Sequence, residues 1–211
     1  MLAMFVNLDE RWHDEFRDWL QEDMFAARLN IGFHACASFD IIPGSEGAGG
    51  DPQQFMTVYE MANVGGLYGE PYQGLRRVRD SRDAAFHERF QDADRYTLSW
   101  TGPEVAGGEP GFAPTVYVDR FDLPPEDAQA FNIWFVTEYL PACDEIEGLL
   151  RVRRYAAIEG ASSAYLFHEF GGPGVLTNES WHELRNADAW AAERINPGGS
   201  AAYTRVISAV L

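Results

Sequence analysis

The two halves of this sequence resemble each other, and this internal repeat limits the possible folds more than any other feature. Matching residues follow the same order in both halves: Phe16 with Phe131, Trp19 with Trp134, Gly32 with Gly148, Phe39 with Tyr155, Glu60 with Glu169, Leu75 with Leu184, Arg76 with Arg185 and Tyr96 with Tyr203. Small changes of spacing fall between the matched segments, as expected of a duplicated unit. We therefore predict one copy at residues 1–104, a linker at 105–112 in a stretch rich in glycine and proline, and a second copy at 113–211.

Within each copy, the spacing of apolar residues alternates between the period of a strand and that of a helix. Residues 2–8 predict a strand, and Trp12, Phe16 and Trp19 recur at helical spacing after Asp9, a suitable N-cap. The later segments predict strands at 32–42, 54–61 and 94–101 with a helical stretch at 66–90, and in the second copy strands at 148–158, 164–170 and 201–209 with a helical stretch at 174–194. The resulting order, β-α-β-β-α-β, is that of a ferredoxin-like unit.

A unit of this kind leaves one face of its sheet uncovered. Helices cover one face of each four-stranded sheet, and the other face also has to be buried. Two copies in one chain solve this by packing sheet against sheet. The sequence therefore predicts an α+β protein in which two tandem ferredoxin-like βαββαβ repeats pack sheet-on-sheet as an α+β barrel. Such a chain is either a monomer that forms an internal pseudo-dimer or part of a homodimer.

Composition and charge exclude several classes of protein. Hydrophobic residues make up 46% of the chain, which excludes disorder, and no stretch reaches the roughly 20 apolar residues of a membrane helix. The net charge of −17 predicts repulsion from nucleic acid and from anionic membranes. The N-terminal residues do not resemble a signal peptide, and Cys36 and Cys143 cannot form a disulfide framework or a zinc site. We therefore expect a cytoplasmic protein without nucleic-acid or membrane partners.

The second copy also contains a recognisable pattern. TEYLPACDEIEGLLRVRRYAAIEG, followed by AYLFHEF and VLTNESWHELR, resembles the W-Y-x-E-E-H-L-P…G-F-L…R-R-Y pattern of EthD-like and ABM-like proteins in the dimeric α+β-barrel superfamily. The resemblance covers nearly all of 113–211 and, more faintly, 1–104. It implies relatives that include cofactor-independent monooxygenases, lactone isomerases, polyketide cyclases, haem-using enzymes and proteins without a known reaction. Tyr139, or Met24 in the first copy, stands where the pattern has a histidine, so an activity that needs that histidine would not carry over.

Polar residues that match between the copies are expected to serve the shared fold. The matched carboxylates are Asp23 with Glu138 and Glu60 with Glu169, and each lies among apolar neighbours in the sequence pattern. A carboxylate on a buried face needs a cation or hydrogen-bond donors. We expect all four to be at least half buried and paired. The alternative is a catalytic carboxylate with a raised pKa.

Polar residues present in only one copy are freer to serve a single site. His34 matches Leu150 and His168 matches Tyr59, and histidine is the usual general base near neutral pH. We name His34, His168, Asp40 and Tyr59 as candidate catalytic residues. The alternative is that these histidines are satisfied core residues or lie at an outer edge.

The strand GFHACASFD predicts one unusually polar face. His34, Cys36, Ser38 and Asp40 alternate onto one side, while Phe33, Ala35, Ala37 and Phe39 take the other. We predict that the apolar set packs under the helices and the polar set faces the interior between the sheets, opposite Leu150, Val152 and Arg154 of the second copy. Candidate substrate-binding residues are Cys36, Ser38, Trp100 and Arg154.

These residues indicate a site for proton transfer on a small apolar molecule. The leading hypothesis is an enzyme that uses no cofactor and no metal and acts on an aromatic or polyketide-like substrate by general acid–base chemistry, as an isomerase, a lyase or an oxygenase. The first alternative is a non-catalytic ligand-binding or stress-response module of the same fold. The second is a haem-binding protein, which the resemblance to the superfamily implies.

Overall fold

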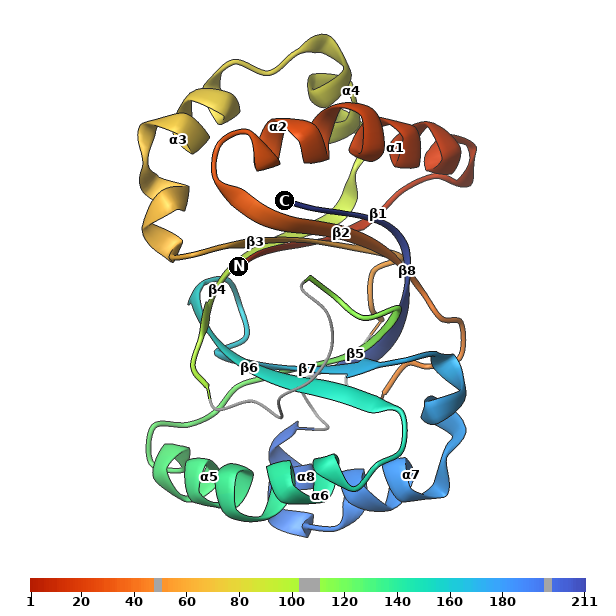
Figure 1. Cartoon of the computed structure of the whole chain (residues 1–211), viewed down its shortest axis with the longest axis vertical. Helices are drawn as coiled ribbons and strands as arrows, with labels where there is room; N and C mark the ends of the chain where they lie inside the picture. Colours follow the sequence, from red (N-terminus) through yellow and green to blue (C-terminus); the bar gives the residue numbers. More distant parts are fainter. Residues whose placement is uncertain (48–50, 103–110, 196–198) are drawn as a thin grey trace.

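The computed structural model describes residues 1–47, 51–102, 111–195 and 199–211. Within these residues the chain forms a closed barrel of antiparallel strands with helices on its outside (Figure 1). Residues 105–110 of the predicted linker lie outside the described residues, and the exact boundaries of the two copies stay a prediction.

Both halves of the chain contain the same order of strands and helices. The first half has β1 (Leu2–Asn7), η1 (Glu10–Trp12), α1 (His13–Trp19), η2 (Leu20–Met24), α2 (Phe25–Leu29), β2 (Phe33–Ile41), β3 (Phe55–Met61), η3 (Val64–Tyr68), α3 (Glu70–Arg77), α4 (Ser81–Arg89) and β4 (Gln91–Trp100). The second half has β5 (Thr115–Phe121), α5 (Ala128–Trp134), η4 (Phe135–Tyr139), α6 (Leu140–Asp144), β6 (Leu149–Glu159), β7 (Ala164–Phe170), η5 (Pro173–Thr177), α7 (Glu179–Asn186), α8 (Ala189–Ile195) and β8 (Ser200–Val210).

The strand order around the barrel is β1-β3-β2-β8-β5-β7-β6-β4, and β4 pairs with β1 to close the ring. Two seams join the halves. In one, β2 pairs with β8, with Ala35 opposite Val210; in the other, β4 pairs with β6, with Trp100 opposite Tyr155. Hydrogen bonding across both seams confirms the predicted α+β barrel.

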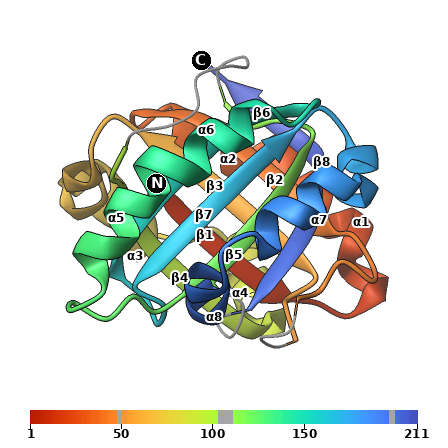
Figure 2. The same ribbon diagram turned by 90° about the horizontal axis from the view of Figure 1, so that it is seen from below.

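The apolar side chains form three layers. The barrel interior is filled by aromatic and aliphatic residues that include Phe5, Phe39 and Phe167. A second layer, with Phe16 and Trp19, lies between the barrel and the helices of the first half, and a third, with Phe131 and Trp181, lies between the barrel and the helices of the second half. Figure 1 shows these helices on opposite sides of the barrel. Seen from below, α5, α6 and α7 lie across the outer face of the second-half strands (Figure 2). The helices therefore cover both outer faces while the strands enclose their own core.

The predicted facing of β2 is correct for Phe33, which packs under the helices, but wrong from Cys36 onward. Ala37 and Phe39 point into the barrel interior, while Cys36 packs in the helix layer of the first half. The closed interior is filled by apolar side chains and has no room for a polar row along β2. The helix side supplies partners instead, because Ser38 lies 3.4 Å from the Thr57 hydroxyl and Asp40 accepts a hydrogen bond from Arg17 at 2.5 Å.

In the second half, the predicted facing of β6 is also reversed. Val152 packs under the helices, and Tyr155 together with the buried Arg153 points inward. The prediction that Leu150, Val152 and Arg154 face the barrel interior is therefore wrong by one residue. A shift of one residue along a strand exchanges its two faces.

The matched carboxylates divide into two pairs. Glu60 and Glu169 are buried or nearly so and are paired with arginine, as predicted. Asp23 and Glu138 are exposed, so the prediction of burial is wrong for them. Asp23 pairs at the surface with Arg82, at 2.8 Å. The helical positions of Asp23 and Glu138 lie on the solvent side because the adjacent Met24 and Tyr139 turn inward.

Candidate functional site at one end of the barrel

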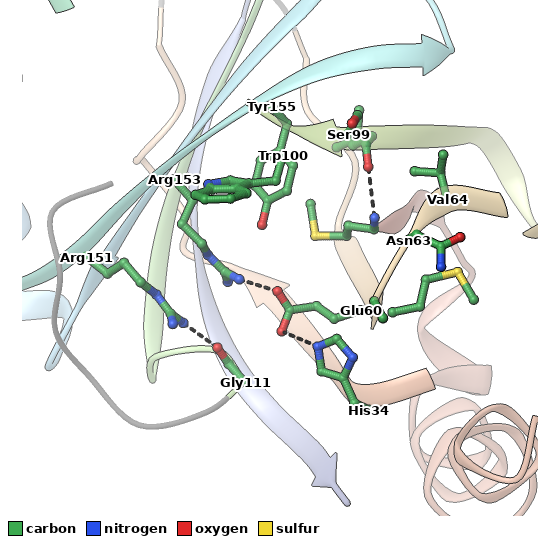
Figure 3. A pocket seen from close by; sticks show the side chains of 14 residues that line it. His34, Glu60, Asn63, Val64, Ser99, Trp100, Gly111, Arg151, Arg153 and Tyr155 are labelled. Carbon is green, nitrogen blue, oxygen red and sulfur yellow. Dashed lines mark hydrogen bonds and ion pairs between the residues drawn. The ribbon is translucent and has the colours of Figure 1, made fainter. Parts of the chain in front are cut away.

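A pocket of about 570 Å³ opens at one end of the barrel, and we call it the mouth pocket. The start of β2, the ends of β3 and β4 and the start of β6 meet here, so both halves contribute. Its lining residues are Met1, His34, Glu60, Met61, Ala62, Asn63, Val64, Leu98, Ser99, Trp100, Gly111, Arg151, Arg153 and Tyr155. Most of these side chains are labelled in Figure 3. The volume suits a small organic ligand.

Two arginines and two glutamates form the floor of the mouth pocket. Arg153 donates to Glu60 of the first half and, through Nε, to Glu169 at 2.7 Å. Arg151 donates to both oxygens of Glu169, at 3.0 and 2.9 Å, and to the carbonyl of Gly111. Figure 3 shows the Arg153 and Arg151 side chains reaching toward Glu60 and Gly111. This cluster balances its own charge.

The buried cation at the centre of this cluster stays charged. Arg153 is about 5% exposed, and burial by itself would lower its pKa. Tyr155 and the carboxylates of Glu169 and Glu60 outweigh that effect and raise the pKa of Arg153 above its usual value. The guanidinium therefore keeps a fixed positive charge at the base of the pocket.

His34 lies beside the free oxygen of Glu60. Its Nε2 is 4.0 Å from Glu60 Oε2, and its side chain is 52% exposed, whereas that of Glu60 is 13% exposed. Figure 3 shows the imidazole turned toward the carboxylate. A register irregularity between Phe33 and Ala35 lets Phe33 pack under the helices while its neighbour turns to the barrel end. The imidazole is therefore accessible to a ligand and next to a carboxylate.

The opposite wall of the mouth pocket is apolar. Trp100 is 56% exposed at the rim, and Tyr155 and Leu98 close the inner side. A Cβ on Gly102, whose φ is +33°, would lie 2.9 Å from the Trp100 indole. The backbone of Gly102 therefore supports the ring at close range, and the indole offers an aromatic surface to a ligand.

The structure brings together only two of the residues proposed from the sequence, His34 and Trp100. Cys36, Ser38, Asp40 and Tyr59 point toward the first-half helices and do not line the mouth pocket. Burial raises the pKa of the Cys36 thiol to about 12 and also raises the pKa of Tyr59, so both remain protonated. Cys36, Ser38 and Asp40 lie on the helix side of β2, and Tyr59 lies on the helix side of β3.

Arg154 also lies away from the mouth pocket. Its guanidinium donates to the hydroxyl of Thr101 at 3.2 Å and lies 5.3 Å from the ring centre of Phe135. It belongs to the helix side of β6, because Arg153 and Tyr155 take the inner face. The predicted contact with a ligand in the barrel interior is therefore wrong.

His168 is fully buried under the second-half helices, in a polar cluster. Its Nε2 lies 2.8 Å from the Tyr139 hydroxyl, and its Nδ1 lies 3.4 Å from the Tyr117 carbonyl and 3.6 Å from Asp119. Burial lowers the pKa of His168 to about 4, although Asp119 opposes the shift. The ring is therefore neutral near pH 7. Since Nδ1 faces two acceptors, it carries the proton, and Nε2 accepts from Tyr139.

Three residues of the mouth pocket escaped the sequence interpretation. Arg151 and Arg153 occupy the positions that Ala35 and Ala37 hold in the first copy, and Tyr155 matches Phe39. The arginines are therefore polar residues present in only one copy, the same signal that selected His34. The repeat predicts a structural role for Glu60, and the structure gives this carboxylate both a structural partner, Arg153, and a place in the pocket beside His34.

Among the described residues, no group of three or more His, Cys, Asp or Glu side chains is arranged to hold a metal ion. No helix in the described part of the chain is long and apolar enough to cross a membrane.

No protein-family model matches the chain, and no curated protein matches it. Solved structures do. An anthrone oxidase-like protein has a TM-score of 0.64 at 10% identity, with 99% of this chain and 91% of that chain covered. The chain shares the α+β-barrel fold of this structure. A "putative monooxygenase" from Lactobacillus acidophilus NCFM has a TM-score of 0.62 at 9% identity, with 99% and 94% covered. A mutant chlorite dismutase from Candidatus Nitrospira defluvii has a TM-score of 0.59 at 12% identity, with 98% and 91% covered.

At such low identities, the likeness establishes the α+β-barrel fold alone. It confirms the fold that the sequence resemblance implied.

Proposed function

We propose that this α+β-barrel protein is an enzyme that transfers a proton to or from a small, largely apolar and aromatic molecule in the mouth pocket. The observation that carries the proposal is the accessible imidazole of His34 beside Glu60, in a pocket that has a guanidinium at its base and an indole at its rim. The solved structures named as monooxygenase and as anthrone oxidase-like support a small-molecule enzyme of this fold.

The shape and lining of the mouth pocket favour a flat, weakly acidic ligand. Trp100 would stack on an aromatic ring, while the polar side of the ligand would face His34 and Glu60. The chain's net charge of −17 favours neutral small molecules over nucleic acid or an anionic membrane as partners. We place the protein in the cytoplasm on the same grounds of composition.

His34 would act as the general base. Its neutral Nε2 takes a proton from an acidic C–H or O–H of the substrate, and the electron pair of the broken bond stays on the substrate as an enolate or phenolate. The imidazolium that forms is attracted to Glu60 Oε2, 4.0 Å away. Arg153 lines the pocket and would offer the substrate anion an N–H donor, although Glu60 and Glu169 already balance its charge.

The subsequent fate of that anion separates the three reaction types. Return of the proton at another atom gives an isomerase, loss of a leaving group gives a lyase, and reaction with dioxygen gives a cofactor-free oxygenase. All three share the first step at His34, so one variant tests them together.

The test is a screen of enolisable and hydroxylated aromatic molecules, with product analysis and oxygen uptake, followed by His34→Gln. We expect the variant to lower turnover roughly 10²–10⁴-fold with a nearly unchanged melting temperature. His87→Gln, on α4 and outside the mouth pocket, is the control and should keep full activity.

Two results would contradict the proposal. A His34→Gln protein with normal specific activity would show that His34 is not the base. Tight binding of aromatic molecules at the mouth pocket with no turnover of any of them would identify a non-catalytic ligand-binding module instead.

A further inference from the structure

A second cleft, of about 470 Å³, lies on the helix side of the second half and shares no lining residue with the mouth pocket. We call it the α7 cleft. Its walls are the segment 42–46 from the first half, Tyr117 of β5, part of η5 and the α7 residues Trp181, His182 and Arg185. It is therefore also built from both halves.

The wall made by the first half is held in place by hydrogen bonds. The amide of Ile42 donates to the Ala202 carbonyl at 2.8 Å, and Ser45 both donates to that carbonyl and accepts from the Ala202 amide, at 3.2 and 3.0 Å. The amide of Gly47 donates to the Ser200 carbonyl at 2.8 Å. These bonds fix the segment against β8, so the cleft is preformed.

The opposite half of the molecule has no equivalent wall. The connection between β2 and β3 covers residues 42–54, whereas the corresponding connection between β6 and β7 covers only 160–163. A long connection within a compact fold is often functional. Its first part, residues 42–47, contacts β8 of the second half, whereas Gln53 and Gln54 also bond to the first half.

A charged pair forms the polar end of the α7 cleft. Arg185 donates one N–H from each terminal nitrogen to Asp119, both at 2.9 Å, and its guanidinium lies 4.4 Å from the ring centre of Tyr117. Asp119 is fully buried and also accepts from the Ser200 hydroxyl. A guanidinium has five N–H groups, so three remain after the two bonds to Asp119. Arg185 lines the cleft with a side chain that is 13% exposed.

The first half keeps the arginine of this cluster, Arg76, but has no carboxylate or histidine to match Asp119 and His168. The strand pairings equate Asp119 with Met4, and the repeat equates His168 with Tyr59 and Tyr139 with Met24. A buried ion pair gains little stability over apolar side chains of similar volume. Stability therefore does not account for the cluster. Both the cluster and the long connection occur on one side only, and they meet at the same cleft.

We propose that the α7 cleft is a second ligand site, for a neutral, mainly apolar molecule that presents a carbonyl or ether oxygen to Arg185. The walls at Ile42, Pro43 and Leu176 supply the apolar contact. Asp119 already balances the charge of Arg185, and Glu46 adds a negative charge to the lining, so an anionic ligand is disfavoured. The acceptor oxygen takes an N–H of Arg185 that Asp119 does not use. This site is independent of the reaction at the mouth pocket.

Three probes of nearly equal size test the α7 cleft: 2-acetylnaphthalene, 2-ethylnaphthalene and 2-naphthoate. Binding is measured by two-dimensional NMR, which separates shifts at α7 from shifts at the mouth pocket. We expect 2-acetylnaphthalene to shift the signals of Leu176 and Trp181 and to bind there at least about tenfold more tightly than the other two, since a hydrogen bond from a charged donor is stronger than one between neutral groups.

The variants are chosen so that no buried charge is left alone. Arg185→Met combined with Asp119→Asn should remove the preference for the acetyl probe. Arg76→Met changes the matching, exposed arginine of the first half and should leave it intact. Leu176→Trp fills the cleft and should abolish binding even if the double variant fails to fold. The proposal is overturned if the acetyl probe causes no shifts at α7, if 2-naphthoate binds more tightly, or if the Leu176→Trp protein binds normally.

Discussion

Removal of Glu169 should destabilise the protein strongly. This residue is fully buried and accepts hydrogen bonds from Arg151, from Arg153 and from the amide of Ala113. Glu169→Ala leaves two arginine side chains, 13% and 7% exposed, facing an empty volume. Breaking a buried pair costs about 3–5 kcal/mol. We expect the lower end, about 3 kcal/mol, because Arg153 keeps Glu60 and Arg151 keeps the Gly111 carbonyl. For a chain of this length that corresponds to a melting temperature lowered by roughly 6–12 °C.

The assay is urea denaturation followed by both circular dichroism and tryptophan fluorescence, so that coincident curves establish a two-state transition. Glu138→Ala is the matched control, because the side chain is exposed, and it should change the free energy of unfolding by less than about 0.5 kcal/mol. A loss below about 1 kcal/mol in Glu169→Ala would refute the reasoning. It would mean that water or the remaining carboxylate satisfies both guanidinium groups.

The pKa of His168 is about 4 in the folded chain and near 6.5 in the unfolded chain. As the pH falls, the unfolded state therefore binds a proton before the folded state does. We expect the free energy of unfolding to fall by about 3 kcal/mol between pH 6.5 and pH 4. In urea denaturation across that pH range, the free energy of unfolding should fall less steeply for His168→Gln than for the unmodified protein. An identical pH dependence would contradict the lowered pKa of His168. Burial raises the pKa of Cys36 and Cys143 to about 12, so neither thiol should react with a thiol reagent until the chain is unfolded, and rapid native labelling would be inconsistent with their burial. Trp100→Ala should weaken the binding of aromatic ligands at the mouth pocket by about 0.5–1.5 kcal/mol in a titration. An unchanged affinity would show that the indole does not contact the ligand. Freshly purified protein should show no haem absorption band, because the proposed function reserves the mouth pocket and the His34 imidazole for a small substrate; a strong band would favour the haem alternative.

The barrel could be predicted because the internal repeat and the spacing of apolar residues both indicate two βαββαβ units. A βαββαβ unit has one sheet face without helices, and two such units in one chain can cover each other. The matched residues Phe16 of α1 and Phe131 of α5 both point from their helices toward the barrel, as the helical spacing predicts. Closure of the barrel could be predicted because the inner faces of the two sheets must be buried, and the predicted helices already cover the outer faces.

Which face of a strand points inward could not be predicted in the same way. Alternation in β2 separates Cys36, Ser38 and Asp40 from Ala37 and Phe39, but it does not say which set meets the helices. The polar set found partners on the helix side, including Arg17, which no sequence pattern linked to Asp40. His34 reached the mouth pocket only because the register shifts beside it.

The charged floor of the mouth pocket depends on contacts between the halves. Glu60 and Arg153 are distant in sequence and meet only after the barrel closes. Comparison of the copies could have selected Arg151 and Arg153, because alanines stand at the matching positions. It could not have paired them with Glu60, since that contact crosses from one copy to the other.

The seam between β2 and β8 also has a consequence for the order of folding. β8 is the last of the eight strands along the chain, and it alone links β2 to β5. Until β8 is in place, the hydrogen-bonding edge of β2 and the apolar side chains inside the ring, such as Phe39, remain open to other molecules. Contacts between residues so far apart in sequence form slowly. We therefore expect the newly made first half to be prone to aggregation until the ring closes.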